Sequence, residues 1–132
     1  MRVNVDQPSA STSAVILVYG RDPKLLHSRG LLLQKTGLEV VQASELMQAY
    51  QLLIERSPLL LVLCHTVTPQ DAESILDKVA GMVNAPKSII LTAHGKGCSV
   101  ADRGESVDVY DGPKALLVSV KKVLNLESYL VQ

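Results

Sequence analysis

Short apolar runs alternate with segments of helical spacing along the chain. The first run is aliphatic, rich in β-branched residues and ended by Gly20, as expected of a buried strand. The third run has no polar alternation, which is typical of a central strand covered on both faces. The five predicted strands are residues 14–19, 38–42, 59–64, 88–92 and 107–110.

Four of the segments that follow these runs carry apolar residues at helical spacing, each after a recognisable start signal. Gly37 predicts the end of the first helix. The start signals are Asp22-Pro23, Ser44, Thr68-Pro69 and Pro113. The expected inward positions are Leu25, Leu26, Arg29, Leu32 and Leu33; Leu46, Ala49, Tyr50, Leu53 and Ile54; Ala72, Ile75, Leu76, Val79 and Val83; and Leu116, Leu117, Val120 and Leu124.

Residues 93–106 have three glycines and only scattered apolar residues, so their course stays open, with a short helix at 99–103 as one possibility. Strands that alternate with helices predict a parallel sheet with right-handed crossovers. We therefore predict an α/β, flavodoxin-like doubly wound sheet of five strands in the order 2-1-3-4-5, with helices on both faces. The expected divisions are a flexible leader at 1–13, a domain at 14–125 and a helix extension or tail at 126–132.

The composition and charge of the chain limit the classes of partner that we expect it to bind. The 132 residues include 13 basic and 13 acidic side chains, four Tyr, and neither Phe nor Trp, which disfavours nucleic-acid binding. No apolar run approaches the roughly 20 residues of a membrane helix, and the polar leader does not resemble a secretory signal. Cys64 and Cys98 lack metal or redox spacing. These features predict a cytoplasmic protein with no membrane contact and no cofactor.

In a doubly wound sheet, ligands bind outside the carboxyl ends of the strands, at the switch point between strands 1 and 3. The residues that follow the predicted strands are therefore the candidate site. They are Gly20, Arg21 and Asp22; Cys64, His65 and Thr66; Thr92 and Ala93; and Asp111, Gly112 and Pro113.

Four motifs give the chain a resemblance to a known family: Val18-Tyr-Gly-Arg-Asp-Pro23, residues 58–69, Ile89-Ile-Leu-Thr-Ala93 and Asp108-Val-Tyr-Asp-Gly-Pro113. Over residues 15–124 it resembles the CheY-like receiver domains of bacterial response regulators. In that family two acids after the first strand hold Mg²⁺, and an Asp ending the third strand accepts a phosphoryl group. A Thr or Ser ends the fourth strand, and Lys-Pro follows the fifth.

Carried over position by position, most of those residues are replaced. The acid pair falls on Gly20 and Arg21, with Asp22 one step further; the acceptor falls on Cys64 or His65; the switch hydroxyl is Thr92; and Lys-Pro becomes Gly112-Pro113. Only the Thr and the Pro match. Mg²⁺ needs oxygen ligands, and an arginine beside it would repel it. We expect no Mg²⁺-dependent aspartyl phosphorylation.

The resemblance therefore implies a stand-alone, degenerate receiver that is not an enzyme and works in two-component signalling by protein binding. Its partner would be a histidine kinase, another regulator, a paralogous receiver or a second copy. The alternative is a phosphotransfer or redox-sensing switch that uses Cys64 or His65. A third, less favoured reading is a small-ligand binder of flavodoxin type.

The end of the chain carries more apolar surface than one packed helical stripe needs. In receiver domains the surface near the last strand and helix commonly contacts partners. The resemblance thus suggests an interaction face here, although the tail could instead fold back over the sheet edge. The residues of this candidate face are Tyr110, Val118, Leu126, Tyr129 and Leu130.

Overall fold

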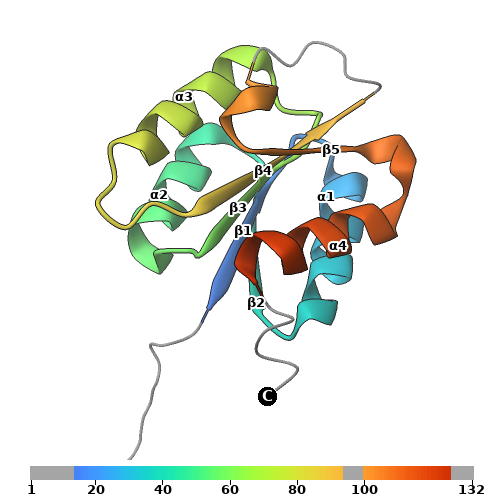
Figure 1. The fold of residues 1–132 in the computed structure, drawn as a ribbon. Coiled ribbons are helices and arrows are strands. Elements are labelled where there is room, and N and C mark those ends of the chain that lie inside the picture. The colour runs from blue at the N-terminus through green and yellow to red at the C-terminus, as the bar shows by residue number, and fades with distance from the viewer. Residues whose placement is uncertain (1–13, 94–99, 126–132) are drawn as a thin grey trace, which may run out of the picture.

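Five parallel strands form one sheet in the order β2-β1-β3-β4-β5 (Figure 1). The structure is a computed structural model, and it describes residues 14–93 and 100–125. The order confirms the predicted flavodoxin-like topology, with the chain reversing direction across the sheet between β1 and β3. The strands are β1 Val15–Tyr19, β2 Glu39–Ala43, β3 Leu60–Leu63, β4 Lys87–Thr92 and β5 Glu105–Asp108.

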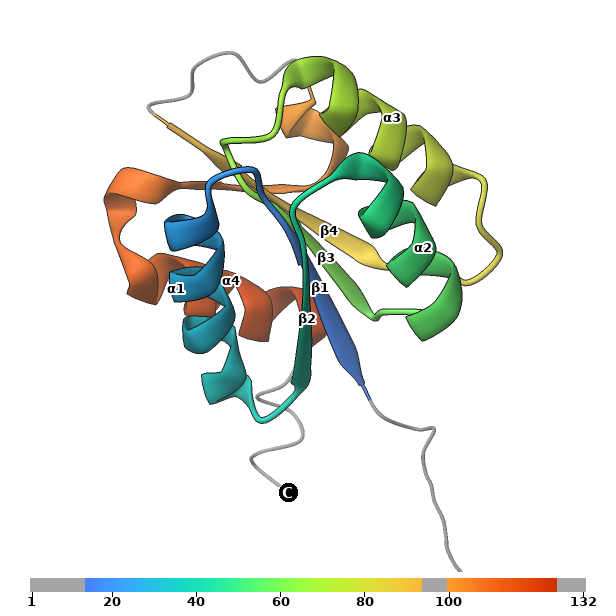
Figure 2. The ribbon, with the colours of Figure 1, turned by 180° about the vertical axis from the view of Figure 1, so that it is seen from behind.

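Helices cover both faces of the sheet. Helices α1 and α4 lie on one face, and α2 and α3 lie on the other, as the two opposite views show (Figures 1 and 2). Three short 3₁₀ segments, η2, η3 and η4, connect these elements. The bounds are α1 Pro23–Leu33, η2 Gln34–Thr36, α2 Leu46–Arg56, α3 Pro69–Ala80, η3 Ala101–Arg103, η4 Val109–Asp111 and α4 Pro113–Leu124. Within the described ranges no helix is long and apolar enough to cross a membrane.

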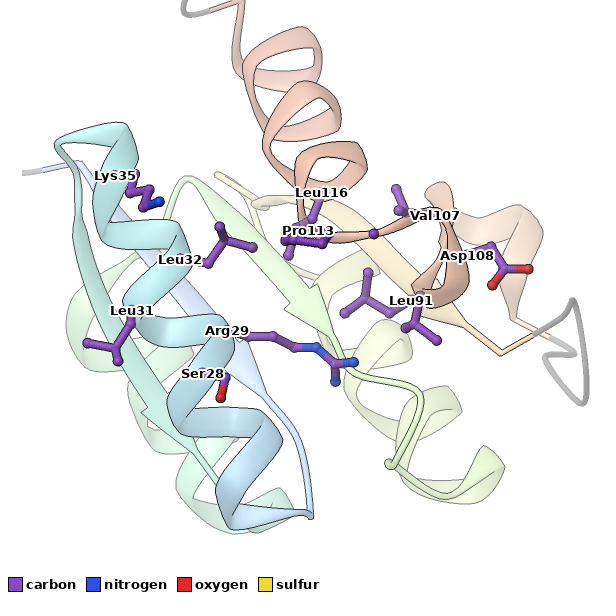
Figure 3. A pocket seen from close by; sticks show the side chains of 12 residues that line it. Ser28, Arg29, Leu31, Leu32, Lys35, Leu91, Val107, Asp108, Pro113 and Leu116 are labelled. Atoms are coloured by element: carbon purple, nitrogen blue, oxygen red, sulfur yellow. The ribbon is translucent and has the colours of Figure 1, made fainter.

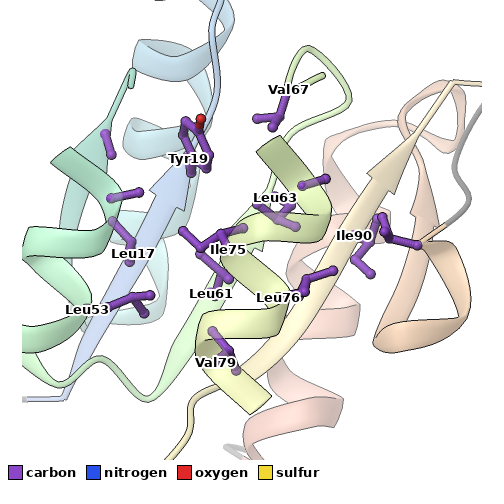
Figure 4. Packing of buried hydrophobic residues seen from close by; sticks show 14 residues of the cluster. Leu17, Tyr19, Leu53, Leu61, Leu63, Val67, Ile75, Leu76, Val79 and Ile90 are labelled. Atoms are coloured by element: carbon purple, nitrogen blue, oxygen red, sulfur yellow. The ribbon is translucent and has the colours of Figure 1, made fainter. Parts of the chain in front are cut away.

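The core has two parts because neighbouring side chains on a strand point to opposite faces. Leu17 and Tyr19 of β1 pack with α2 and α3, alongside Leu61 and Leu63 of β3 (Figure 4). The alternate residues of these strands point to the other face, toward α1 and α4. This second cluster contains Ile16, Val18, Leu60, Val62, Ile89 and Leu91.

The predicted start signals hold at three helices, α1, α3 and α4, where a proline begins the first turn, and fail at α2. Asp22 Oδ1 accepts from the backbone N–H groups of Lys24 and Leu25 at 3.0 and 3.2 Å, and Thr68 caps α3. Ser44 does not cap α2: the capping position is Glu45, which makes no side-chain hydrogen bond. Instead Gln48 Oε1 accepts from the Ser44 N–H at 3.0 Å, so the helix satisfies this donor from its own first turn.

Four predicted core residues are exposed: Leu25 at 36%, Leu59 just before β3 at 48%, and Ile54 and Val83. Ile54 is 63% exposed, because it follows the buried Leu53 and its side chain lies about 100° further round α2. Val83 is 97% exposed, because α3 ends at Ala80 and Val83 lies in the loop beyond it. The errors at Ile54 and Val83 come from extending a helical stripe past the part that touches the sheet.

The last third of the chain also differs from prediction. The fifth strand starts earlier, at Glu105, and ends at Asp108, whose carboxylate accepts from the Tyr110 N–H at 2.9 Å and starts η4. Of the possible helix at 99–103, the described residues show only the 3₁₀ turn η3. The predicted leader at 1–13 and the tail at 126–132 lie outside the described ranges.

Candidate functional site at the carboxyl ends of the strands

Gly20 and Cys64 follow the paired ends of β1 and β3 and lie against each other. Tyr19 and Leu63 are register partners, and the Cys64 N–H donates to the Tyr19 carbonyl at 2.9 Å. A Cβ built on Gly20 would stand 2.9 Å from both Cβ and Sγ of Cys64, closer than such atoms pack. Cys64 therefore occupies the space that any side chain at residue 20 would need.

Arg21 turns away from the strand ends toward α3. Its backbone N–H donates to Thr66 Oγ1 at 2.9 Å, and its Nη1 lies 3.6 Å from Asp71 Oδ2. The buried Tyr19 hydroxyl donates to the same Asp71 oxygen at 3.5 Å. Burial first, and then the Asp71 charge, raise the pKa of Tyr19 to about 12, against the opposing effect of Arg21. The Arg21 charge is thus partnered by an acid at the start of α3.

Asp22, the acid that follows the predicted acid pair in the sequence, is engaged elsewhere. The Asp22 carboxylate accepts from two N–H groups in the first turn of α1, which is the role predicted for it as an N-cap. A carboxylate held there stabilises its helix and is directed at that helix end.

Arg29 is a site residue that the sequence analysis missed. From α1 its Nη2 lies 3.5 Å from His65 Nδ1, and its guanidinium also acts on the Cys64 thiol, where it opposes the rise in pKa that burial causes. Its Nη1 is buried and finds no hydrogen-bond partner in the described part of the chain. The signal was present, since Arg29 is a charged residue on an otherwise leucine-rich inward stripe. A cation therefore lies at the end of β3.

These surroundings keep both candidate nucleophiles uncharged. Burial raises the pKa of the Cys64 thiol, although the Arg29 charge and hydrogen bond oppose this effect. Burial lowers the pKa of His65, and Arg29 lowers it further, while Asp22 acts in the other direction. At neutral pH the thiol is protonated and the imidazole is neutral, so neither resembles an activated thiolate or an imidazolium pair.

The remaining predicted positions follow β4 and β5. Thr92 is buried at the end of β4, in register with Asp108. Gly112 has φ +90° and ψ 170°, a backbone region that essentially only glycine adopts, and Pro113 then begins α4. A lysine at residue 112 would be strained in this conformation.

The residues at the strand ends do not fit Mg²⁺. A hard divalent cation prefers carboxylate and carbonyl oxygens, whereas Cys64, His65 and Arg29 offer sulfur, nitrogen and positive charge. Across residues 14–93 and 100–125, no three His, Cys, Asp or Glu side chains gather in a way that could hold a metal ion.

The predicted interaction face is described only in part. Tyr110 in η4 and Val118 in α4 are each 65% exposed. Leu126, Tyr129 and Leu130 lie outside the described residues. The exposed pair shows that apolar surface exists beside β5, while the contribution of the tail stays a prediction.

The geometry matches known structures better than the sequence does. The fold is that of response regulator receiver domains. A receiver domain from Clostridium thermocellum superposes with a TM-score of 0.72 at 22% identity, over 89% of this chain and 98% of that one. A CheY-like receiver from Methanospirillum hungatei JF-1 gives 0.72 at 18% identity, with the same coverage. A two-component AraC-type transcriptional regulator from Clostridium phytofermentans gives 0.73 at 14%, over 91% of this chain and all of that one (100%).

Comparison by sequence finds no match: no protein-family model and no curated protein matches the chain. Identities this low show a shared fold and carry no residue roles with them.

Proposed function

We propose that this chain is a degenerate receiver domain that acts in two-component-type signalling by binding other proteins, without Mg²⁺-dependent aspartyl phosphorylation and without catalysis of its own. One observation carries the proposal. At the end of β3, where a receiver has its acceptor Asp, Cys64 packs against Gly20 and is covered by Arg29.

The chemistry of those residues supports the loss of phosphorylation. An acyl phosphate requires a carboxylate nucleophile, and the third strand ends in a protonated thiol and a neutral imidazole. The acid pair is equally compromised, because Gly20 has no room for a side chain and Arg21 is paired with Asp71. Without that chemistry, the role that the proposal leaves to this fold is the binding of other proteins.

An amide ¹H–¹⁵N spectrum with and without Mg²⁺ plus beryllofluoride, a phosphoryl mimic, tests this loss directly. We expect no saturable shifts at Gly20, Cys64 or Thr92. A receiver domain that keeps its acids serves as the positive control in the same buffer. Saturable shifts at the three residues would overturn the proposal.

The binding role rests on the exposed pair beside β5. Val118→Asp places a charge on the candidate face, and Val83→Asp makes the same change at an exposed valine after α3. If the face mediates self-association, sedimentation velocity will show an oligomer that Val118→Asp dissociates and Val83→Asp leaves intact. Titration with a purified histidine kinase or an intact receiver extends the same comparison to other partners.

The alternative function uses Cys64 or His65 as a phosphotransfer or redox switch. What favours it is the Arg29 guanidinium, which contacts both side chains and could stabilise an added anionic group. Replacing both residues by Ala would abolish function under this alternative and leave partner binding intact under the proposed function. Phosphohistidine at residue 65 or reversible oxidation at residue 64, found by mass spectrometry, would favour the switch.

A further inference from the structure

A cavity of about 440 Å³ lies between α1 and α4, on the face of the sheet that these two helices cover (Figure 3). This volume falls within the roughly 300–1,000 Å³ of small-molecule sites and far exceeds the voids of a packed core. The residues that line it are Ser28, Arg29, Leu31, Leu32, Lys35, Leu91, Val107, Asp108, Val109, Gly112, Pro113 and Leu116.

The walls of the cavity are mainly aliphatic. Leu91 and Val107 come from β4 and β5, while Leu32 and Leu116 come from α1 and α4, and all four belong to the second core cluster or pack against it. The cavity is thus a gap in the core on this face, left where the two helices stand apart. Its surface favours an apolar ligand body.

Charge is distributed unevenly around this apolar surface. Arg29 and Lys35 both come from the α1 side, and Figure 3 shows the Arg29 side chain crossing toward the end of β3. Asp108 is the one lining carboxylate; it accepts from the Tyr110 N–H at 2.9 Å and points away from Arg29 in Figure 3. The Arg29 side of the cavity is therefore positive.

Arg29 also has an unused donor. Its Nη1 is shielded from solvent and has no hydrogen-bond partner in the portion of the chain that the structure describes, a state that ordinarily destabilises a protein. A carboxylate in the cavity would offer acceptors to the Arg29 guanidinium, which binds carboxylates in a bidentate manner.

We propose that this cavity binds a small organic acid, with its carboxylate on Arg29 and its apolar body against Leu32, Leu91 and Leu116. The inference goes beyond the proposed function, since it needs neither a protein partner nor the loss of phosphorylation. Because the same guanidinium contacts Cys64 and His65, an occupied cavity would also change the surroundings of the β3 end.

Titration with octanoate, followed by amide ¹H–¹⁵N shifts, tests the site, and 1-octanol is the matched uncharged probe. We expect saturable octanoate shifts at Arg29, Leu91, Val107 and Leu116, with a smaller shift at His65, and binding of octanol at least about tenfold weaker, as a charge-assisted contact implies. Equal affinity for the two probes, or shifts confined to other surfaces, would overturn the proposal.

Variants assign the contact to Arg29. Arg29→Gln should weaken octanoate binding about tenfold and leave the weak octanol binding unchanged, whereas Arg56→Gln on the opposite face should change neither. Because the chain has no Trp, Leu31→Trp at the exposed edge of the cavity adds a unique fluorescence reporter for the same titration. Undiminished octanoate binding by a folded Arg29→Gln variant would refute the assignment. No Mg²⁺, phosphoryl mimic or partner is present, so this result is separate from the tests of the proposed function.

Discussion

Gly20→Ala should destabilise the protein through a single, identifiable contact. The added methyl carbon would stand 2.9 Å from both Cβ and Sγ of Cys64 and 3.4 Å from Thr66 Oγ1. Carbon atoms pack at about 3.5–4.0 Å, so the two Cys64 contacts are too short by more than half an ångström. Overpacking of this kind costs about 1–3 kcal/mol, and the reduced freedom of the unfolded chain returns about 0.4–1 kcal/mol. We expect a net loss of about 1–2 kcal/mol.

A double-mutant cycle identifies Cys64 as the cause. Cys64→Ala removes the Sγ contact and keeps the Cβ contact, so Gly20→Ala should cost about 1 kcal/mol less in that background. The matched control is Gly81→Ala, where a Cβ would meet its nearest atom, the Lys78 carbonyl oxygen, at an ordinary 3.7 Å. We expect Gly81→Ala to be neutral or slightly stabilising.

Urea unfolding followed by far-ultraviolet circular dichroism measures all five free energies of unfolding, those of the wild type, the three variants of the cycle and Gly81→Ala, and it needs no tryptophan, which this chain lacks. The reasoning fails if Gly20→Ala costs no more than Gly81→Ala. It also fails if the cost of Gly20→Ala is the same with and without the Cys64 thiol, because the two residues would then be uncoupled.

Two titrations test the electrostatics around the strand ends. Arg29→Gln should raise the pKa of His65 by removing a nearby positive charge, and Asp22→Asn, which still caps α1, should lower it; ring proton shifts against pH measure both, and equal values in the two variants would contradict the assignment. Tyr19 has a folded-state pKa raised from 10.0 to about 12, so it favours folding below pH 10 and that contribution is lost as pH rises toward 12; Tyr19→Phe should flatten this part of the stability profile, and an unchanged slope would argue against the raised pKa.

The sheet was predictable because its signals are local and repeated. Five aliphatic runs, separated by segments long enough for crossovers, leave few topologies other than the parallel order that the structure has. Asp22 and Thr68 were likewise predictable as N-caps, because each accepts hydrogen bonds from backbone N–H groups two or three residues further along. The prediction that Ser44 caps α2 was wrong for a related reason. Gln48, four residues later, accepts a hydrogen bond from the Ser44 N–H instead, and residue type alone does not decide between the two arrangements.

The location of the site was predictable from the sequence, whereas the contacts of its side chains were predictable only in part. Strand ends locate Gly20, Cys64 and Thr92, since register follows from the fold. The pairing of Arg21 with Asp71 depends on how α3 is placed over β1, which no local pattern states. The backbone conformation of Gly112, which essentially only glycine adopts, is also a property of the η4 turn, and the sequence shows only a glycine before a proline.

Arg29 shows why the rest could not be predicted. Its spacing places it on the inward stripe of α1, where an arginine is either a snorkelling side chain or a buried charge with partners. Deciding between the two requires the distance from α1 to the end of β3 and the width of the gap to α4. Both depend on side chains from several elements that lie far apart in the sequence. Arg29, a charged residue on an apolar helical stripe, is thus the residue that connects the strand-end site with the cavity. Its substitution is therefore the most informative change in this protein.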